Sequence, residues 1–169
     1  MSFSLVPKQL CRSIYALDLE RLRQRGIRLL LADLDNTLAR YSERQPSPEL
    51  RSWAEEAKAH GITLFVLSNS RKATRADEFC HALNIPYLKH AGKPKKPGFA
   101  KALEINGVSA KEAAIVGDQI FTDILGGNWS DVYTILVHPL AIDNAFRAFR
   151  YGIETPFRLC SPDKSEWRK

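Results

Sequence analysis

An apolar run that ends in two carboxylates constrains the fold of this chain more than any other feature of its sequence. Residues 29–32 are three leucines and an alanine, and Asp33 and Asp35 follow them, separated by one residue. A short continuous apolar run is typical of a strand that is buried on both faces, as in parallel sheets. Open α/β sheets bind their ligands beyond the carboxyl ends of their strands. The run therefore predicts a buried parallel strand that leads into a functional site.

Strand-like and helix-like segments alternate along the rest of the chain. Apolar and β-branched runs alternate with helical patterns, several of which begin at a capping residue or end at a glycine. This alternation predicts a Rossmann-like, doubly wound parallel sheet in a three-layer α/β/α sandwich. The expected strands are residues 27–32, 62–67, 86–88, 113–116 and 133–137, and the expected helices are residues 18–25, 47–60, 73–83, 97–105 and 120–125.

The length of the chain fits one compact domain. With 169 residues it can bury a sizeable core without disulfides or structural metals. We expect a single domain over residues 1–169, with its core at about residues 27–140 and helices flanking the core at both ends. Residues 4–17 are expected to form a loosely amphipathic opening segment. Residues 161–169 are expected to form a mobile, charged end.

The composition indicates where the protein is located and which kinds of partner it can bind. No apolar run approaches the roughly 20 residues of a membrane-spanning helix, and the N-terminal residues lack the apolar region of a signal peptide. We therefore expect a cytoplasmic location. Cys11, Cys80 and Cys160 are far apart and show no CxxC spacing, which predicts reduced thiols. A net charge of +6 favours anionic partners such as phosphate esters, anionic lipid surfaces or RNA.

Polar residues follow the other predicted strands at the point where each strand ends. Ser68 and Asn69 follow the second strand, Asp118 follows the fourth, and Asp123 lies five residues later. Lys93 lies in a basic loop before a predicted helix. Carboxylates from two strand ends can hold Mg²⁺, which prefers oxygen ligands. A hydroxyl, backbone amides and an ammonium group can hold phosphate oxygens beside it. The arrangement predicts phosphoryl transfer.

The order of these motifs resembles that of the haloacid dehalogenase (HAD) superfamily. The matching motifs lie at residues 33–37 (DxDxT), 68–69, 93–94 and 117–123, and the resemblance extends over about residues 27–137. It implies the HAD fold and a phosphatase that works through an aspartyl-phosphate. Asp33 would be the nucleophile and a Mg²⁺ ligand, and Lys93 would bind the substrate phosphate. Asp35 would act as general acid and then as general base, and its backbone carbonyl would also reach the metal.

The resemblance assigns roles to four further residues. Ser68 would donate a hydrogen bond to a transferring oxygen, and Asn69 would also belong to the phosphate-binding set. Asp118 would ligate Mg²⁺, and Asp123 would be either a ligand or a partner of one.

Several of these residues have an alternative structural interpretation. The two carboxylates after the first strand could simply form a turn. Ser68 could cap the helix that follows the second strand, and Asp118 could favour a helix start by its negative charge. Lys95 and Lys96 compete with Lys93, because a basic loop is often only solvated.

A closer resemblance is to the subfamily IIIA group of YqeG-like proteins, which includes phosphatidylglycerophosphate phosphatases. It depends above all on residues 117–119, 122–128 and 133–137. The chain departs from this group at Trp129 and Asp131, where a basic residue and a glycine are expected. The intervals between the motifs are too short for an inserted cap domain. We therefore expect a capless, open site that suits a large substrate, a lipid headgroup or a protein, or one covered by a neighbouring subunit of a homo-oligomer.

Two basic segments, residues 19–25 and 145–151, have the pattern of helices that lie on an anionic membrane surface. The alternative is that both helices only flank the sheet with their apolar sides in the core. Nucleic-acid binding is not expected, because no RNA-binding motif accompanies the charge.

Three functions remain open from the sequence. The first is a Mg²⁺-dependent phosphomonoesterase, with phosphatidylglycerophosphate as the substrate that the resemblance implies. The second is a non-catalytic or regulatory binding protein, for example in the assembly of an RNA–protein complex. The third is a phosphoaspartyl receiver domain, which would have no need for Asp35 as an acid.

Overall fold

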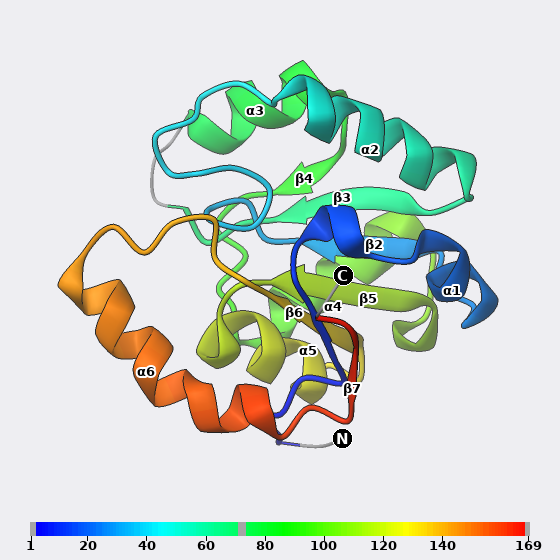
Figure 1. The fold of residues 1–169 in the computed structure, drawn as a ribbon. Coiled ribbons are helices and arrows are strands. Elements are labelled where there is room, and N and C mark those ends of the chain that lie inside the picture. The colour runs from blue at the N-terminus through cyan, green and yellow to red at the C-terminus, as the bar shows by residue number, and fades with distance from the viewer. Residues whose placement is uncertain (1–2, 71–73, 168–169) are drawn as a thin grey trace.

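A parallel sheet forms the centre of the structure, a computed structural model that describes residues 3–70 and 74–167 (Figure 1). Within these residues the sheet has seven strands in the order β4-β3-β2-β5-β6-β1-β7. On one side of β2 lie β3 and then β4, and on the other side lie β5 and then β6. The strand order thus runs outward in both directions from the centre of the sheet, as in doubly wound sheets. The strands are β1 (Gln9–Cys11), β2 (Leu29–Ala32), β3 (Thr63–Leu67), β4 (Tyr87–Leu88), β5 (Ala113–Gly117), β6 (Tyr133–Val137) and β7 (Asp163–Glu166).

Helices connect these strands and cover both faces of the sheet (Figure 1). Side-chain oxygens of Asp18, Ser47 and Asn144 accept hydrogen bonds from backbone amides in the first turns of α1, α2 and α6. Such caps satisfy amides that have no partner within the helix. The helices are α1 (Leu19–Gln24), α2 (Pro48–Ala59), α3 (Arg75–Leu83), α4 (Lys96–Asn106), α5 (Leu125–Trp129) and α6 (Ala145–Leu159), with short helical segments η1 (Ile14–Ala16), η2 (Ala110–Glu112) and η3 (Ile120–Ile124).

The central strand β2 contributes side chains to a core on each side of the sheet. Leu30 and Ala32 pack with α1, α2 and α3, whereas Leu29 and Leu31 pack with α4. All four side chains are fully buried. Because successive side chains of a strand point to opposite faces, only an apolar run can occupy this position. The doubly wound α/β fold predicted from the sequence is therefore confirmed.

Two predictions about the chain ends are wrong. Residues 4–17 include the strand β1, and residues 161–169 include β7 instead of only a mobile end. β7 reads Asp-Lys-Ser-Glu and carries no apolar pattern, so nothing local marks it as a strand. Its pairing with β1 forms it, together with a 2.6 Å hydrogen bond from Gln9 to the buried Glu166. Long-range contacts override weak local propensity here.

Two other expectations concern membrane spans and thiols. In the described part of the chain, no helix has the length and apolar character required to cross a membrane. The three cysteines are free, as predicted, and Cys11 and Cys80 are buried. Burial raises the pKa of both buried thiols to about 12, so they stay protonated.

Candidate active site

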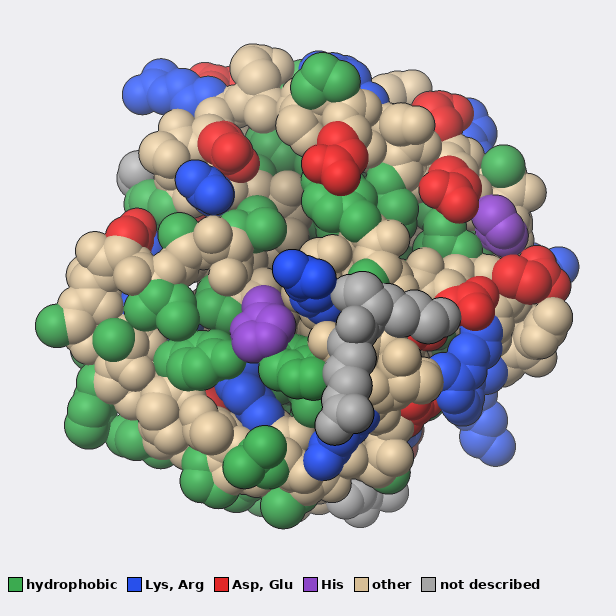
Figure 2. All heavy atoms as spheres, viewed as in Figure 1, with side chains coloured by type: hydrophobic (Ala, Val, Ile, Leu, Met, Phe, Trp, Pro, Cys, Tyr) green, Lys and Arg blue, Asp and Glu red, His purple; other side chains and the backbone are tan. Residues whose placement is uncertain are grey.

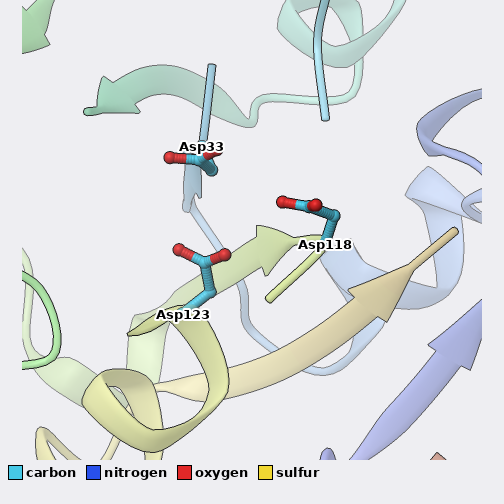
Figure 3. Close-up of side chains that lie close together, drawn as sticks. All are labelled: Asp33, Asp118 and Asp123. Atoms are coloured by element: carbon cyan, nitrogen blue, oxygen red, sulfur yellow. The ribbon is translucent and has the colours of Figure 1, made fainter. Parts of the chain in front are cut away.

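Three buried aspartates meet at the carboxyl ends of two neighbouring strands (Figure 3). Asp33 follows β2, Asp118 follows β5, and Asp123 lies in η3. β2 and β5 are paired in the sheet, with Ala32 opposite Val116, so the next residue of each strand lies at the same edge. One oxygen from each carboxylate lies within 4.8 Å of the others. The sequence predicted this convergence, and the structure brings the three residues together.

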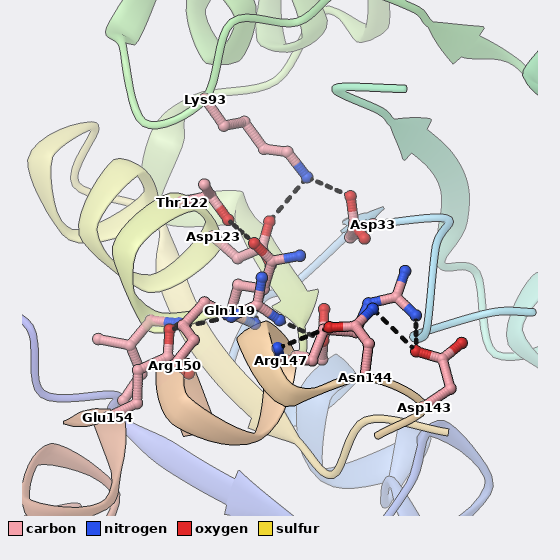
Figure 4. A network of polar contacts seen from close by, with 12 residues as sticks. Asp33, Lys93, Gln119, Thr122, Asp123, Asp143, Asn144, Arg147, Arg150 and Glu154 are labelled. Carbon is pink, nitrogen blue, oxygen red and sulfur yellow. Dashed lines mark hydrogen bonds and ion pairs between the residues drawn. The ribbon is translucent and has the colours of Figure 1, made fainter. Parts of the chain in front are cut away.

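Lys93 places its ammonium group between two of these carboxylates (Figure 4). Its Nζ donates hydrogen bonds to Asp33 Oδ1 at 2.6 Å and to Asp123 Oδ1 at 2.7 Å. The Lys93 side chain is 1% exposed. Lys95 is instead exposed and precedes α4 at its N-cap position. Among the competing lysines, the geometry therefore favours Lys93, as the sequence predicted.

Asn69 holds the Lys93 loop in place. Its side-chain amide donates to the Lys93 carbonyl and its Oδ1 accepts from the Lys93 backbone amide, both at 2.9 Å. Ser68 is buried, and its Oγ accepts a hydrogen bond from the Ser70 amide at 3.0 Å. Ser68 does not cap the following helix, because Thr74 is the N-cap residue of α3. Contact of Ser68 and Asn69 with phosphate stays a prediction.

Asp35 is not part of the aspartate cluster and pairs with an arginine from α3. Arg75 Nε lies 2.7 Å from Asp35 Oδ1. The guanidinium group also donates to the carbonyls of Arg40 and Glu43, which belong to the loop after β2. Arg75 thus fixes both the loop and the Asp35 carboxylate. The sequence analysis missed Arg75, because a single arginine in a helical segment has no local pattern that indicates such a contact.

The helix α6 supports Asp118 from the other side. Arg150 Nη2 lies 3.6 Å from Asp118 Oδ2, and Arg158 Nη2 donates to the Asp118 carbonyl at 3.0 Å. Glu154 accepts from Arg158 at 2.8 Å and from the Ile120 amide at 2.9 Å. Arg150 is therefore directed toward the site. No sequence motif indicated these contacts.

Burial raises the free-energy cost of keeping the aspartates of this site ionised. Burial is the main cause that raises the pKa of Asp33 to about 7, although Lys93 opposes the shift. Burial also raises the pKa of Asp118 well above its usual range, and Asp33 and Asp123 add to the shift. Burial alone would lower the pKa of Lys93, but the two carboxylates at its ammonium group raise it, so Lys93 stays charged. A further cation would stabilise the ionised aspartates.

The donor set fits a hard divalent cation. Both carboxylate oxygens of Asp118 are buried, and within the described residues neither accepts a hydrogen bond. Buried polar atoms normally have a partner, so these two oxygens fit a metal ligand. Mg²⁺ prefers oxygen ligands and is bound through few carboxylates. The Asp33, Asp118 and Asp123 cluster could therefore hold such an ion.

Gly117 permits the close approach of Asp123. A Cβ atom at Gly117 would lie 2.2 Å from Asp123 Oδ2, which is closer than van der Waals contact allows. The glycine that ends β5, directly before Asp118, is therefore required by the position of the neighbouring carboxylate, not by a turn.

The family of the chain follows from a match over most of its length. The model of the haloacid dehalogenase-like hydrolases matches residues 5–131, which include β1 to β5, the aspartate cluster and Lys93, but not α6. The chain belongs to this family. The superfamily and the hydrolase class predicted from the motifs are thereby confirmed for this haloacid dehalogenase-like hydrolase.

Curated relatives of this hydrolase are named as phosphatases, in agreement with the predicted enzyme class. It is 34% identical to the probable phosphatase YqeG of Bacillus subtilis (strain 168), over 83% of this chain and 81% of that protein. It is 32% identical to phosphatidylglycerophosphate phosphatase 1, chloroplastic/mitochondrial, of Arabidopsis thaliana, over 81% of this chain and 42% of the relative. A chloroplastic phosphatidylglycerophosphate phosphatase 1 of Chlamydomonas reinhardtii is 31% identical, over 80% of this chain and 53% of the relative. The chain thus spans about half the length of these two lipid phosphatases.

Solved structures share the fold at low sequence identity. A hypothetical protein from Xanthomonas campestris superposes with a TM-score of 0.56 at 16% identity, over 89% of this chain and 80% of the other. The cobalt-bound deoxy-D-mannose-octulosonate 8-phosphate phosphatase of Haemophilus influenzae superposes with a TM-score of 0.51 at 14% identity, over 67% of this chain and 69% of the other. These similarities support the fold alone.

The two departures from the YqeG-like pattern have a structural context. Asp131 has a φ of 59°, in the left-handed region that glycine favours and aspartate tolerates. Trp129 ends α5, and its ring contacts Phe3 edge-on with centroids 5.8 Å apart. The ammonium group of Lys96 lies 5.5 Å from the centroid of the Trp129 ring. Asp131 thus adopts a backbone conformation that glycine favours.

Proposed function

We propose that this chain is a Mg²⁺-dependent phosphomonoesterase that forms an aspartyl-phosphate on Asp33. The observation that carries the proposal is the buried cluster of Asp33, Asp118 and Asp123, with Lys93 bonded to two of the three. The Asp118 carboxylate, buried and without a hydrogen-bond donor among the described residues, supports a metal ligand at this position. A purely structural turn would not need three carboxylates in one buried cluster.

The chemistry assigns separate tasks to the two carboxylates after β2. An Asp33 oxygen attacks phosphorus, and the bond from phosphorus to the ester oxygen breaks. Asp35 donates a proton to that leaving oxygen. Water then attacks the phosphorus of the aspartyl-phosphate, Asp35 accepts a proton, and inorganic phosphate leaves as Asp33 is restored. Lys93, with Ser68 and Asn69 nearby, would hold the phosphoryl oxygens.

Mg²⁺ bound by Asp33, Asp118, Asp123 and the Asp35 carbonyl would offset the negative charge of the phosphoryl group and the nucleophile. The chain's own cation, Lys93, already provides part of this compensation. Arg75 holds the Asp35 carboxylate at the edge of the site and outside the aspartate cluster. This separation supports a proton-transfer role for Asp35 and a nucleophilic role for Asp33.

We propose phosphatidylglycerophosphate as the substrate, with the enzyme at the surface of an anionic membrane. The names of two relatives support this choice. The described interval between Asp35 and Ser68 contains one helix and one strand, which supports an open, capless site that a lipid headgroup can reach. The cytoplasmic location and a homo-oligomer stay predictions.

Phosphate release tests this function. Wild type should hydrolyse an aryl phosphate with Mg²⁺ and lose the activity when the metal is chelated, and Asp33→Asn should be inactive. Asp77→Asn is the matched control, because Asp77 pairs with Lys89 and Tyr87 away from the cluster. Equal and negligible rates in wild type and Asp33→Asn would refute the enzyme and favour a non-catalytic binding role.

The substrate is tested separately with a panel of phospholipid vesicles, nucleotides and sugar phosphates. Phosphate release from phosphatidylglycerophosphate vesicles would support the proposed substrate. Release only from another class would refute this substrate while leaving the phosphatase mechanism intact.

A further inference from the structure

The helix α6 exposes its apolar side chains to solvent. Phe146, Phe149, Ile153 and Leu159 are 73%, 68%, 46% and 67% exposed. Their spacing places them on one side of the helix, which we term the outer face of α6. Hydrophobic side chains accordingly gather over the position of α6 in the space-filling view (Figure 2). A helix that only flanks the sheet would bury these residues and expose its charges.

The opposite side of α6 is polar and faces the protein. Arg150, Glu154 and Arg158 recur every four residues, and Glu154 and Arg158 are buried. They contact Asp118 and the amide of Ile120, as described above. Rotation of the helix to bury its outer face would break these contacts and expose buried charge partners. The exposure of the outer face is therefore fixed by the polar face beneath it.

Charge distinguishes which surface the outer face can meet. Each of the three arginines of α6 lies near a carboxylate: Arg147 near Asp143, Arg150 near Asp118 and Arg158 near Glu154. The charge that distinguishes possible partners is therefore the net charge of the whole chain, +6. Two copies of a chain with this net charge would repel each other on close approach. An anionic lipid surface would attract them, and a bilayer accepts phenylalanine and aliphatic side chains at the boundary of its headgroups.

The second basic segment of the sequence does not share these properties. In α1, Leu19 and Leu22 are buried in the core. Arg21 and Arg25 both lie near the Asp163 carboxylate, at 2.7 Å and 3.8 Å. The interpretation of α1 as a helix that flanks the sheet therefore fits its contacts, and α6 differs from it.

We propose that the outer face of α6 inserts into the headgroup region of an anionic lipid bilayer and docks the enzyme there. The proposal rests on the proposed function, because the polar face of the same helix contacts Asp118. A docked α6 would thus place the aspartate cluster next to the membrane surface, where a phosphorylated lipid headgroup can enter it. The cations of α6 would lie between the bilayer and the cluster.

Vesicle binding and hydrolysis of a water-soluble substrate test the docking separately. The variant is Phe146→Ser/Phe149→Ser, and the matched control is Ile105→Ser, an exposed apolar residue of α4. We expect wild type and the control to sediment with vesicles that contain phosphatidylglycerol. The double variant should bind them about a hundredfold more weakly, because two phenylalanines no longer leave water. All three proteins should hydrolyse an aryl phosphate at equal rates, which also shows that they are folded.

The outcomes separate docking from function. If the double variant binds the vesicles as wild type does, the docking proposal is overturned whether or not the enzyme is active. If wild type fails to bind vesicles and forms a dimer that the double variant dissociates, the outer face is an interface between copies, which also overturns it. If wild type and control bind, the double variant does not, and none hydrolyses a phosphate ester, docking stands and the proposed function fails.

Discussion

The ammonium group of Lys93 contacts two buried carboxylates and compensates part of their charge, so we predict that Lys93→Met weakens both folding and catalysis. Its Nζ lies 2.6 Å from Asp33 Oδ1 and 2.7 Å from Asp123 Oδ1, with 1% of the side chain exposed. Removal of one partner from a buried ion pair destabilises a protein by about 3–5 kcal/mol. We expect one such loss, not two, because Asp33, with a pKa already raised to about 7, can take up a proton in the variant.

The loss should depend on pH in a defined direction. Lys93 opposes the rise in the pKa of Asp33, so its removal raises that folded-state pKa further. An aspartate in the unfolded chain titrates near about pH 4, so folding of the variant binds a proton. The free energy of unfolding therefore falls as pH rises from about 4 through the folded-state pKa. The amount by which the free energy of unfolding of Lys93→Met falls below that of wild type should be larger at about pH 8 than at about pH 6.

Urea unfolding in the presence of a chelator measures this difference without a contribution from bound metal. Turnover of an aryl phosphate with Mg²⁺ should fall about 10²–10³-fold, as when one preorganised charge is removed from an active site. Lys95→Met is the matched control, because Lys95 is exposed in the same loop. A Lys93→Met protein that unfolds at the wild-type urea concentration and keeps its activity would refute the reasoning. An equal loss in Lys95→Met would do the same.

Three further predictions follow from individual contacts. In Gly117→Ala the new Cβ would lie 2.2 Å from Asp123 Oδ2, so we expect turnover to fall at least about tenfold and Mg²⁺ binding, measured by calorimetry, to weaken. Arg75→Met frees the Asp35 carboxylate, so kcat should fall more than KM rises and the acidic limb of the pH–rate profile should move. Arg75→Lys should restore part of the activity. An unchanged pH–rate profile in Arg75→Met would contradict the positioning of Asp35 by Arg75. Burial, and then two nearby arginines, lower the pKa of His138, so the unfolded state binds more protons and stability is lost as pH falls below about 6.5; in urea titrations His138→Gln should flatten this dependence.

Local patterns were sufficient to predict the centre of the fold. The buried strand at Leu29–Ala32 can only lie inside a sheet, because every side chain is apolar and both faces must be covered. Its carboxyl end, with those of the neighbouring strands, then has to carry the polar residues. Asp33 and Asp118 could be placed at one edge for this reason, whereas the role of Lys93, in a basic loop, came from the family resemblance.

The ends of the chain could not be predicted in the same way. β7 has no apolar periodicity, and it becomes a strand only because β1 offers it backbone partners and Glu166 meets Gln9. The position of Arg75 beside Asp35 likewise depends on how α3 packs against the loop after β2. The spacing of residues within one segment does not indicate contacts between residues that lie forty positions apart in the sequence.

The sequence by itself determined the central strands of the sheet, the chemistry at their carboxyl ends and the family, because a buried strand and its terminal carboxylates are properties of neighbouring residues. Only the tertiary structure decided the orientation of α6. The helix carries both arginines and phenylalanines, and amphipathicity alone would place the phenylalanines inside. Glu154 and Arg158 reverse that orientation because their buried partners, the Ile120 amide and the Asp118 carbonyl, belong to a distant loop.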